Sequence, residues 1–262
     1  MAIITLTSDW GLRDHYLASV KAAILSRLPD AQIIDISHEI PPFDLNQASF
    51  IVRNCWKGFP KGTVHILGIN TEASLKTPHT LAVMDGHYFL GADNGIFSLI
   101  FDTPPDQLIE LEVAQDTDYF TFSSRDVFVK AAVHILKGKP VDQLGPDRKQ
   151  LTPREAFRPV VNGNVITGKV VYIDVYENAF INISREFFQQ ISKGRPFTIE
   201  FNYTRHRIRK MSESYGDVPE GEILALFSTT GLLQIAMNRG NAAGLLGLSV
   251  DDTIRVVFEG GS

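Results

Sequence analysis

The sequence lacks several features that mark particular classes of protein. Cys55 is the only cysteine among 262 residues, so an intrachain disulfide is impossible and a cysteine-based zinc site is excluded. No apolar run approaches the roughly 20 residues that a membrane-spanning helix needs. The N-terminal stretch MAIITLTSDW has no basic n-region, and its apolar part is too short for a signal peptide. These absences predict a cytoplasmic protein without a membrane span.

Positive charge is also scarce. The 25 Lys and Arg residues are outnumbered by 30 Asp and Glu residues, which gives a net charge of −5. Proteins that bind nucleic acid usually carry a basic patch. The basic cluster Arg205, Arg207, Arg209 and Lys210 alternates at strand spacing and is typical of a solvated strand face. We therefore expect no nucleic-acid partner.

Common catalytic and cofactor motifs are missing too. The sequence has no G-x-G-x-x-G or G-K-[ST] stretch, so a phosphate cradle is not expected. It has no G-x-S-x-G nucleophile elbow. The histidines do not pair at metal-ligand spacing, and we interpret His38 and His65 as packed or capping residues. We expect neither a metal nor a bound cofactor.

The first half of the chain does have a regular alternation of strand and helix patterns. Such alternation is typical of an α/β layer with mostly parallel strands. A hairpin around Asp85-Gly86 completes this layer. The predicted strands are 2–7, 32–36, 63–69, 81–84 and 88–92, and the predicted helices are 16–28, 45–56 and 125–136.

The pattern changes in the stretch 145–159, which is rich in proline and charge and lacks periodicity, as expected of a linker. Strand patterns separated by Gly and Pro turns follow it, and they favour a small β-barrel. The predicted strands there are 164–174, 197–201, 205–210, 223–227 and 253–258. We predict an α/β domain with a mostly parallel central sheet over residues 1–160 and an all-β barrel domain over residues 161–262.

Polar and aromatic residues alternate after the apolar run that begins at Val170. Asp174, Tyr176, Asn178, Phe180 and Asn182 stand at even offsets, so they would share one face of an extended chain. A carboxylate, two amides and two aromatic rings make a poor core. The spacing raises the question of what this face binds.

Short motifs follow three of the predicted strands. Ser8-Asp9-Trp10-Gly11 stands at the carboxyl end of the first strand, where open α/β sheets bind ligands. Asp9 could accept two hydrogen bonds from a ribose diol or could cap the next helix, as could Asp14. The sequence GADNG at 91–95 is typical of a tight turn. The sequence STTG at 228–231 could offer donors to a carboxylate.

Five segments match the motifs of one family in order along nearly the whole chain. They are TSDWGLRDHYLASVKA, IIDISHEIPPFDLNQASF, GADNGIF, IDVYENAFINI and STTGLLQIAMNRGNAAGLLG. They resemble the S-adenosylmethionine hydroxide adenosyltransferases and their relatives, the fluorinase and chlorinase. In that family the fourth segment reads I-D-x-F-G-N-x-x-T-N-I. The resemblance implies displacement of methionine at the ribose C5′ carbon, in a homotrimer whose ligand lies between the α/β domain of one subunit and the barrel of its neighbour.

The resemblance also implies roles for individual residues. Asp9 would accept the ribose diol, Asp174 would hold the ammonium of the methionine moiety, and Asn178 would hydrogen-bond the adenine edge. The implied aromatic neighbours of the nucleoside are Phe43, Tyr176, Phe180 and Tyr215, and the implied carboxylate-binding residues are Thr229 and Thr230.

The sequence departs from the family where water is activated. The water-using branch positions water with an Asp–Arg–His triad, whose places are taken here by Asn70, Thr77 and Ser123. Neither Asn nor Ser is a competent general base at neutral pH without an added partner. Ser124 coincides with the fluorinase serine. Glu72 is the one new carboxylate in the loop, and it is either a base or a solvated loop residue.

Two functions therefore remain in view. The leading hypothesis is an enzyme that cleaves S-adenosylmethionine to adenosine and methionine, or that transfers the adenosyl group to another nucleophile. The alternative is a catalytically silent protein that binds S-adenosylmethionine or adenosine. A structural protein with a vestigial pocket is disfavoured because Asp9, Asp174 and Asn178 are retained.

Overall fold

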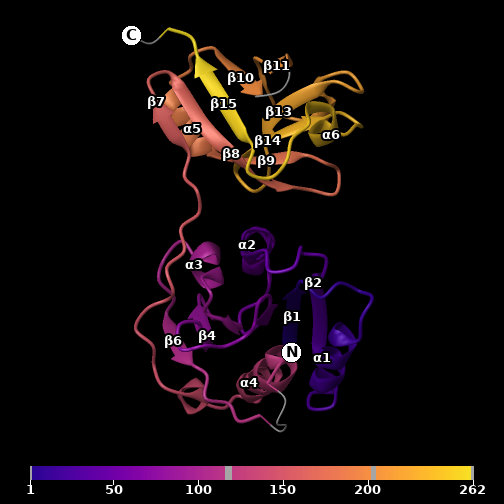
Figure 1. Cartoon of the computed structure of the whole chain (residues 1–262), viewed down its shortest axis with the longest axis vertical. Helices are drawn as coiled ribbons and strands as arrows, with labels where there is room; N and C mark the ends of the chain where they lie inside the picture. Colours follow the sequence, from indigo (N-terminus) through magenta and orange to yellow (C-terminus); the bar gives the residue numbers. More distant parts are fainter. Residues whose placement is uncertain (1, 116–119, 202–204, 261–262) are drawn as a thin grey trace. The chain divides into compact units, whose positions relative to one another are not determined.

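The computed structural model describes residues 2–115, 120–201 and 205–260. The chain forms two compact units, residues 1–156 and 157–262 (Figure 1).

A mixed six-stranded sheet forms the centre of the described part of the first unit. Its strands follow the order β2-β1-β3-β5-β4-β6. The strands β2, β1, β3 and β5 are parallel, whereas β4 pairs antiparallel with β5 and β6. The predictions of a mostly parallel sheet and of a hairpin at Asp85-Gly86 are confirmed. The bounds are β1 (Ile3–Ser8), β2 (Gln32–Ser37), β3 (Val64–Gly68), β4 (His79–Met84), β5 (His87–Ala92) and β6 (Gln107–Glu110).

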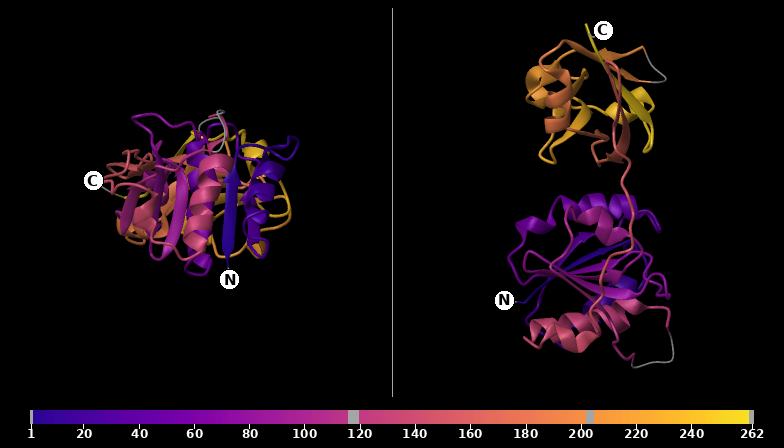
Figure 2. Two further views of the ribbon diagram at one scale, coloured as in Figure 1. Left: turned by 90° about the horizontal axis from the view of Figure 1, so that it is seen from below. Right: turned by 90° about the vertical axis from the view of Figure 1, so that its left-hand side faces the viewer.

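Helices cover both faces of this sheet (Figure 2). One core forms between the sheet and the helices α1 and α4, and a second core forms between the opposite face and α2 and α3. Ile66 and Leu67 of β3 belong to opposite cores, as the two-residue period of a strand requires. A strand buried on both faces reads as a continuous apolar run, which is why β3 shows no alternation. The bounds are α1 (Tyr16–Leu25), α2 (Leu45–Arg53), α3 (Ile96–Ile100) and α4 (Val129–Leu136).

Two predicted segments of the first unit differ from the structure. The helix expected over 125–136 is a π-helical turn, η2 (Ser124–Phe128), that continues directly into α4. The start of the expected linker is bonded to β6, because Ile109 forms a bridge with Asp147 and Arg148 N–H donates to the Leu108 carbonyl. Short 3₁₀ turns complete the unit at η1 (Trp56–Gly58) and η3 (Val141–Leu144).

The second unit is built on a nine-stranded, largely antiparallel sheet within its described residues, and β12 and β13 are parallel. The order is β11-β10-β15-β8-β9-β14-β13-β12, with β7 beside β8. The strand predicted over 205–210 is wrong in extent, since only Arg207–Ile208 is extended there. The bounds are β7 (Val160–Asn162), β8 (Val165–Ile173), β9 (Ala179–Ser184), α5 (Arg185–Ser192), β10 (Phe197–Phe201), β11 (Arg207–Ile208), β12 (Met211–Ser212), η4 (Tyr215–Asp217), β13 (Ile223–Phe227), β14 (Leu232–Met237), α6 (Ala242–Leu246) and β15 (Thr253–Phe258).

A line of polar side chains crosses the buried centre of the first sheet. His65 of β3 lies between Thr5 of β1 and His87 of β5, with Nδ1 2.8 Å from Thr5 Oγ1 and Nε2 3.2 Å from His87 Nδ1. Burial, with a smaller effect of His87, lowers the pKa of His65 to about 3. The packed interpretation of His65 is confirmed, and the ring is neutral in the folded protein near pH 7.

The lowered pKa of His65 predicts that the folded protein loses stability in mild acid. Below pH 6.5 the unfolded chain protonates His65 whereas the folded chain does not, so the free energy of unfolding should fall as the pH drops from about 6.5 towards 3. The slope from this one residue is up to about 1.4 kcal/mol per pH unit. Urea unfolding at pH 7.5, 6 and 5 should therefore show a flatter pH dependence for His65→Asn than for the wild type.

The matched control is His134→Asn on α4, where the imidazole is partly exposed and its Nε2 lies 2.7 Å from the Pro140 carbonyl. Its pH dependence should follow the wild type. An equal slope in His65→Asn and wild type would contradict the assignment.

Candidate functional site

The strand order of the first sheet reverses next to β1. The chain passes from β1 through α1 to β2 on one side, and returns through α2 to β3 on the other side. Loops therefore diverge at the carboxyl ends of β1 and β3, and open α/β sheets bind ligands at such a point. We call this the carboxyl edge; it is formed by the residues that follow β1, β2, β3 and β5, namely Asp9, His38, Asn70 and Asn94.

Asp9 is oriented at this edge by the neighbouring loop. Its Oδ2 accepts a hydrogen bond from Phe43 N–H at 2.8 Å, and Phe43 itself has a left-handed φ of 67° and an exposed ring. Gly11 N–H donates to the His38 carbonyl at 2.7 Å. Neither Asp9 nor Asp14 caps α1, which begins after His15 without a side-chain cap. The capping interpretation is therefore wrong, and Asp9 Oδ1 accepts no hydrogen bond from a described residue.

Buried His38, which follows β2, connects the ends of β1 and β2 through its side chain. Its Nδ1 lies 2.6 Å from Ser8 Oγ, and its Nε2 lies 3.2 Å from Asp35 Oδ1. Burial would raise the pKa of Asp35, but hydrogen bonds from Lys21 and His38 outweigh it and lower the pKa. His38 is therefore a packed residue, as expected, and it fixes the backbone beside Asp9.

An aromatic wall stands next to Asp9 and was not anticipated from the sequence. The Trp10 ring is stacked near His38, with centroids 6.3 Å apart, and it meets the Phe122 ring edge to face, with centroids 5.7 Å apart. A Cβ atom on Gly68 would lie 2.4 Å from Trp10 Cζ2. Glycine at the end of β3 is therefore what lets the indole lie across the sheet edge.

The GADNG motif is a turn whose side chains hydrogen-bond to the loop after β3 and to the segment around Thr152. Asn94 Nδ2 donates to the carbonyls of Ile69 and Asn70 at 3.2 and 3.0 Å. Asp93 is fully buried and accepts from Thr152 N–H at 2.7 Å, with an Arg148 guanidinium nitrogen at 2.9 Å. The turn interpretation is confirmed, and the motif holds the loop after β3.

The three residues at the triad positions do not hydrogen-bond to one another in the described structure. Asn70 is exposed with a left-handed φ of 46°. The Thr77 hydroxyl lies 2.8 Å from Ser74 Oγ and closes a local turn. Glu72 is exposed. Ser123 is buried at the start of η2. The arrangement offers no ready-made copy of the triad.

Ser124 is the most enclosed of the candidate polar residues. It is 0% exposed, and its Oγ is buried without a hydrogen-bond partner. It begins the π-helical turn η2, which packs against β3 and β5. Single π turns inside α-helices are frequent at functional sites. The unpaired hydroxyl is a polar atom that a small ligand or water could bind.

In the second unit, the expected polar face is not extended. Residues 174–178 form a tight turn between β8 and β9, closed by a hydrogen bond from Asp174 N–H to the Asn178 carbonyl at 3.1 Å. Asp174 accepts from Tyr176 N–H, Asn178 N–H and Asn178 Nδ2 at 2.9–3.0 Å. The prediction of one continuous face is wrong, because Glu177 takes a left-handed φ of 58° and reverses the chain.

A polar and aromatic cluster lies beside this turn. Phe180 is paired with Gln234 of β14, and Gln234 Oε1 accepts from the Tyr215 hydroxyl at 3.1 Å. Asn178 and Phe180 are buried, whereas the Tyr176 side chain is exposed. Gln234 thus connects Phe180, through strand pairing, with Tyr215, through a hydrogen bond. Gln234 was missed, although it stands inside the fifth family segment.

Thr229 and Thr230 lie in the hairpin between β13 and β14. Thr229 is exposed, and Thr230 Oγ1 lies 2.7 Å from Ser228 Oγ. Leu232 pairs with Ser184 at one end of β9, while Asn178 precedes the other end, Ala179. At the usual rise per residue of a β-strand, the two ends of β9 are about 16 Å apart. The structure therefore places Asn178 and the hairpin of Thr229 and Thr230 at opposite ends of β9.

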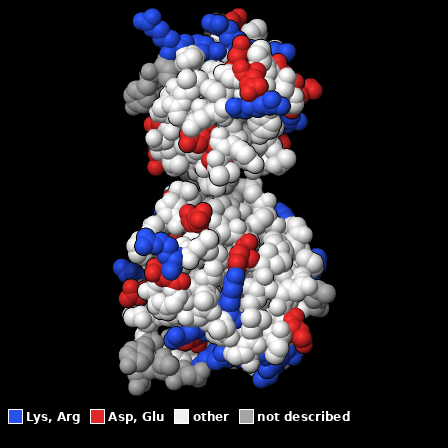
Figure 3. Space-filling model, turned by 90° about the vertical axis from the view of Figure 1, so that its right-hand side faces the viewer, with Lys and Arg blue, Asp and Glu red and all other residues white. Residues whose placement is uncertain are grey.

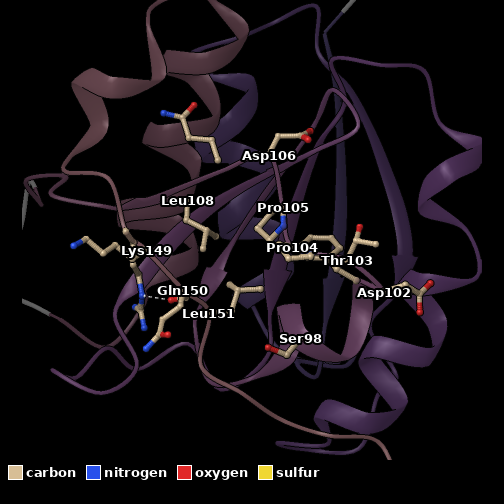
Figure 4. A pocket seen from close by; sticks show the side chains of 13 residues that line it. Ser98, Asp102, Thr103, Pro104, Pro105, Asp106, Leu108, Lys149, Gln150 and Leu151 are labelled. Carbon is tan, nitrogen blue, oxygen red and sulfur yellow. Dashed lines mark hydrogen bonds between the residues drawn. The ribbon is translucent and has the colours of Figure 1, made fainter.

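A separate hollow of about 500 Å³ lies in the first unit between the loop after α3 and the segment 148–151 (Figure 4). None of the predicted site residues lines it. Its lining is Ser98, Phe101, Asp102, Thr103, Pro104, Pro105, Asp106, Gln107, Leu108, Arg148, Lys149, Gln150 and Leu151.

The surface and side-chain clusters give no sign of other ligand classes. Positive and negative side chains are interspersed on the face shown in Figure 3. Within the described residues, no group of three or more His, Cys, Asp or Glu side chains is placed to hold a metal ion. No helix in that part of the chain is both long enough and apolar enough to cross a membrane.

Comparisons with known proteins agree with this geometry. Residues 4–145 match the N-terminal domain of the SAM hydroxide adenosyltransferases, and residues 168–255 match their C-terminal domain. The chain belongs to this family. The resemblance noted in the sequence is therefore confirmed, and it extends over both units.

Similar proteins carry two different names. The (R)-S-adenosyl-L-methionine hydrolase of Thermus thermophilus is 30% identical over 98% of this chain and 100% of its own. The fluorinase of Nocardia brasiliensis is 24% identical over 97% of this chain and 96% of its own. A crystal structure of an uncharacterized conserved protein from Thermotoga maritima has a TM-score of 0.88 at 27% identity, covering 97% of this chain and 99% of that one.

The contact between Trp10 and Gly68 predicts a mutational effect. Gly68→Ala would push a methyl group into the indole, and overpacking of this kind typically costs about 1–3 kcal/mol of unfolding free energy. Urea unfolding should detect this loss. Gly58→Ala is the matched control, because nothing lies within 4 Å of the added Cβ and the φ is ordinary. Equal stability of both variants would contradict the close approach.

Proposed function

We propose that the protein hydrolyses S-adenosylmethionine to adenosine and methionine. The observation that carries the proposal is the match over 98% of the chain to a protein named (R)-S-adenosyl-L-methionine hydrolase. The oriented Asp9 carboxylate at the strand-order reversal supports it, because such a group can accept ribose hydroxyls. Water would attack C5′, and methionine would leave with the electron pair of the C5′–S bond.

We assign Asp9 to the ribose diol and Asn178 to the adenine edge. Asp174 would orient Asn178, since its carboxylate already accepts hydrogen bonds from the Asn178 backbone and side chain. Thr229 and Thr230 would bind the amino-acid carboxylate at the far end of β9. The proposed aromatic neighbours of the nucleoside are Phe43, Tyr176, Phe180 and Tyr215.

We also propose the larger organisation that the family resemblance implies. Residues 1–160 and 161–262 would be separate domains, and the nine-stranded sheet of the second, which also carries α5 and α6, would close into a barrel. The protein would be a cytoplasmic homotrimer that needs no cofactor. A monomer by light scattering at micromolar concentration, with adenosine still bound, would contradict the trimer.

The role of Asp9 can be tested by binding. If its carboxylate accepts both ribose hydroxyls, Asp9→Ala should lose about 1.5–3 kcal/mol, or ten- to a hundredfold in adenosine affinity. Isothermal titration calorimetry measures this directly. Asp30→Ala is the control, an exposed carboxylate in the loop between α1 and β2. Unchanged affinity in Asp9→Ala would place the ribose elsewhere.

The reaction itself is tested by chromatography of S-adenosylmethionine incubated with the wild-type protein. Adenosine and methionine should form in equal amounts, and added fluoride or chloride should not yield a halogenated nucleoside. Binding of S-adenosylmethionine without any product would favour the silent alternative. A 5′-haloadenosine would identify halide as the nucleophile instead.

A further inference from the structure

His79 is an imidazole held at the carboxyl edge by regular structure. It is the first residue of β4 and pairs with Ala92, the last residue of β5. Because β4 runs antiparallel to β5, its beginning lies at the edge where the parallel strands end. The His79 carbonyl accepts a hydrogen bond from Leu111 N–H at 2.8 Å. The position of the ring therefore depends on strand pairing on both sides of β4.

The hydrogen bonding of this ring fixes its tautomer. Nε2 lies 2.9 Å from the Thr71 carbonyl oxygen, which can only accept. Nε2 therefore carries the hydrogen, and in the neutral ring Nδ1 is a bare acceptor. No described residue donates to Nδ1. The ring presents one nitrogen that can take a proton.

The ring is neutral near pH 7. Burial lowers the pKa of His79, with the Thr71 carbonyl acting in the opposite direction. Charged groups on the elements packed against it are already paired, Asp93 with Arg148 and Asp126 with Arg125. Glu72 and Lys76, in the loop before β4, are exposed.

The ring also lies against the helical turn that carries the serine candidates. The rings of His79 and Phe128 meet edge to face, with their centroids 5.1 Å apart and their planes at 85° to each other. Phe128 ends η2, and Ser124 begins it, so the two side chains are about one helical turn apart on the same buried face. Ser124 Oγ has no partner there. His79 thus approaches, from the sheet, the turn at whose start Ser123 replaces the triad histidine.

We infer that His79 is the general base of the reaction, supplying from β4 the imidazole that is missing at position 123. The inference rests on the proposed hydrolysis of S-adenosylmethionine. The water oxygen bonds to C5′ as the C5′–S bond breaks and its electron pair stays on the methionine sulfur. Nδ1 of His79 takes the proton from the attacking water and later releases it to solvent. The unpaired Ser124 hydroxyl is the second group that orients this water.

The test is His79→Gln, whose side-chain amide can still donate to the Thr71 carbonyl but cannot take a proton. The rate constant kcat for adenosine formation should fall about 10²- to 10⁴-fold, the usual contribution of general-base catalysis. KM and adenosine affinity should stay within a few-fold of the wild type. The acid limb of the wild-type pH–rate profile should disappear from the residual activity. His134→Gln, which replaces an imidazole bonded to another backbone carbonyl, should behave as wild type.

The outcomes separate this inference from the function on which it rests. A His79→Gln variant with wild-type kcat and an unchanged pH profile would overturn the inference alone. Loss of activity in His79→Ala but not in His79→Gln would show that the ring only holds the Thr71 loop, and would also overturn it. A wild-type protein that binds S-adenosylmethionine without forming adenosine would overturn both the inference and the hydrolase proposal.

Discussion

The reversal of strand order at β1 is the constraint on which the candidate site depends. It separates the loops after β1 and β3, and Asp9 directly follows Ser8, the last residue of β1 that pairs with β3. Hydrogen bonds from Phe43 N–H to Asp9 and from Gly11 N–H to the His38 carbonyl then hold the loop after β1 against the loop after β2. Because these bonds involve backbone groups, Asp9 is oriented before any ligand binds, which limits the entropy lost on binding.

The proposed substrate explains why so little catalytic machinery is needed. A sulfonium leaving group already carries positive charge, so no general acid has to protonate it. The protein must align water with C5′ and exclude competing solvent. Trp10 and Phe122 supply apolar surface beside Asp9, and the buried Ser124, two residues after Phe122, supplies a polar atom without a hydrogen-bond partner. In this account the imidazole of His79, on β4, supplies the remaining group, the general base.

The sequence predicted the first unit better than the second, for reasons that individual residues make clear. Strands such as Val64–Gly68 are buried on both faces and therefore read as continuous apolar runs in the sequence. By contrast, α5 was missed, because the apolar residues Phe187, Phe188 and Ile191 follow a strand directly. Its signal was the N-cap Ser184, whose hydroxyl accepts from Phe187 N–H.

The turn at 174–178 was missed because alternation alone does not reveal a reversal of the chain. The family pattern has glycine where this chain has Glu177, and the left-handed φ of Glu177 shows why. His79 was overlooked for a different reason. Its significance comes from antiparallel pairing with Ala92 and from contact with Phe128, which lies 49 positions further along the chain. Spacing within the sequence cannot report such contacts.

Turnover of S-adenosylmethionine in ¹⁸O-labelled water tests most directly the claim that this chain uses water to displace methionine at C5′. The account predicts adenosine that carries one ¹⁸O atom at its 5′ oxygen, together with unlabelled methionine, as measured by mass spectrometry. Adenosine without the label, or intact S-adenosylmethionine recovered from protein that binds it, would contradict the account.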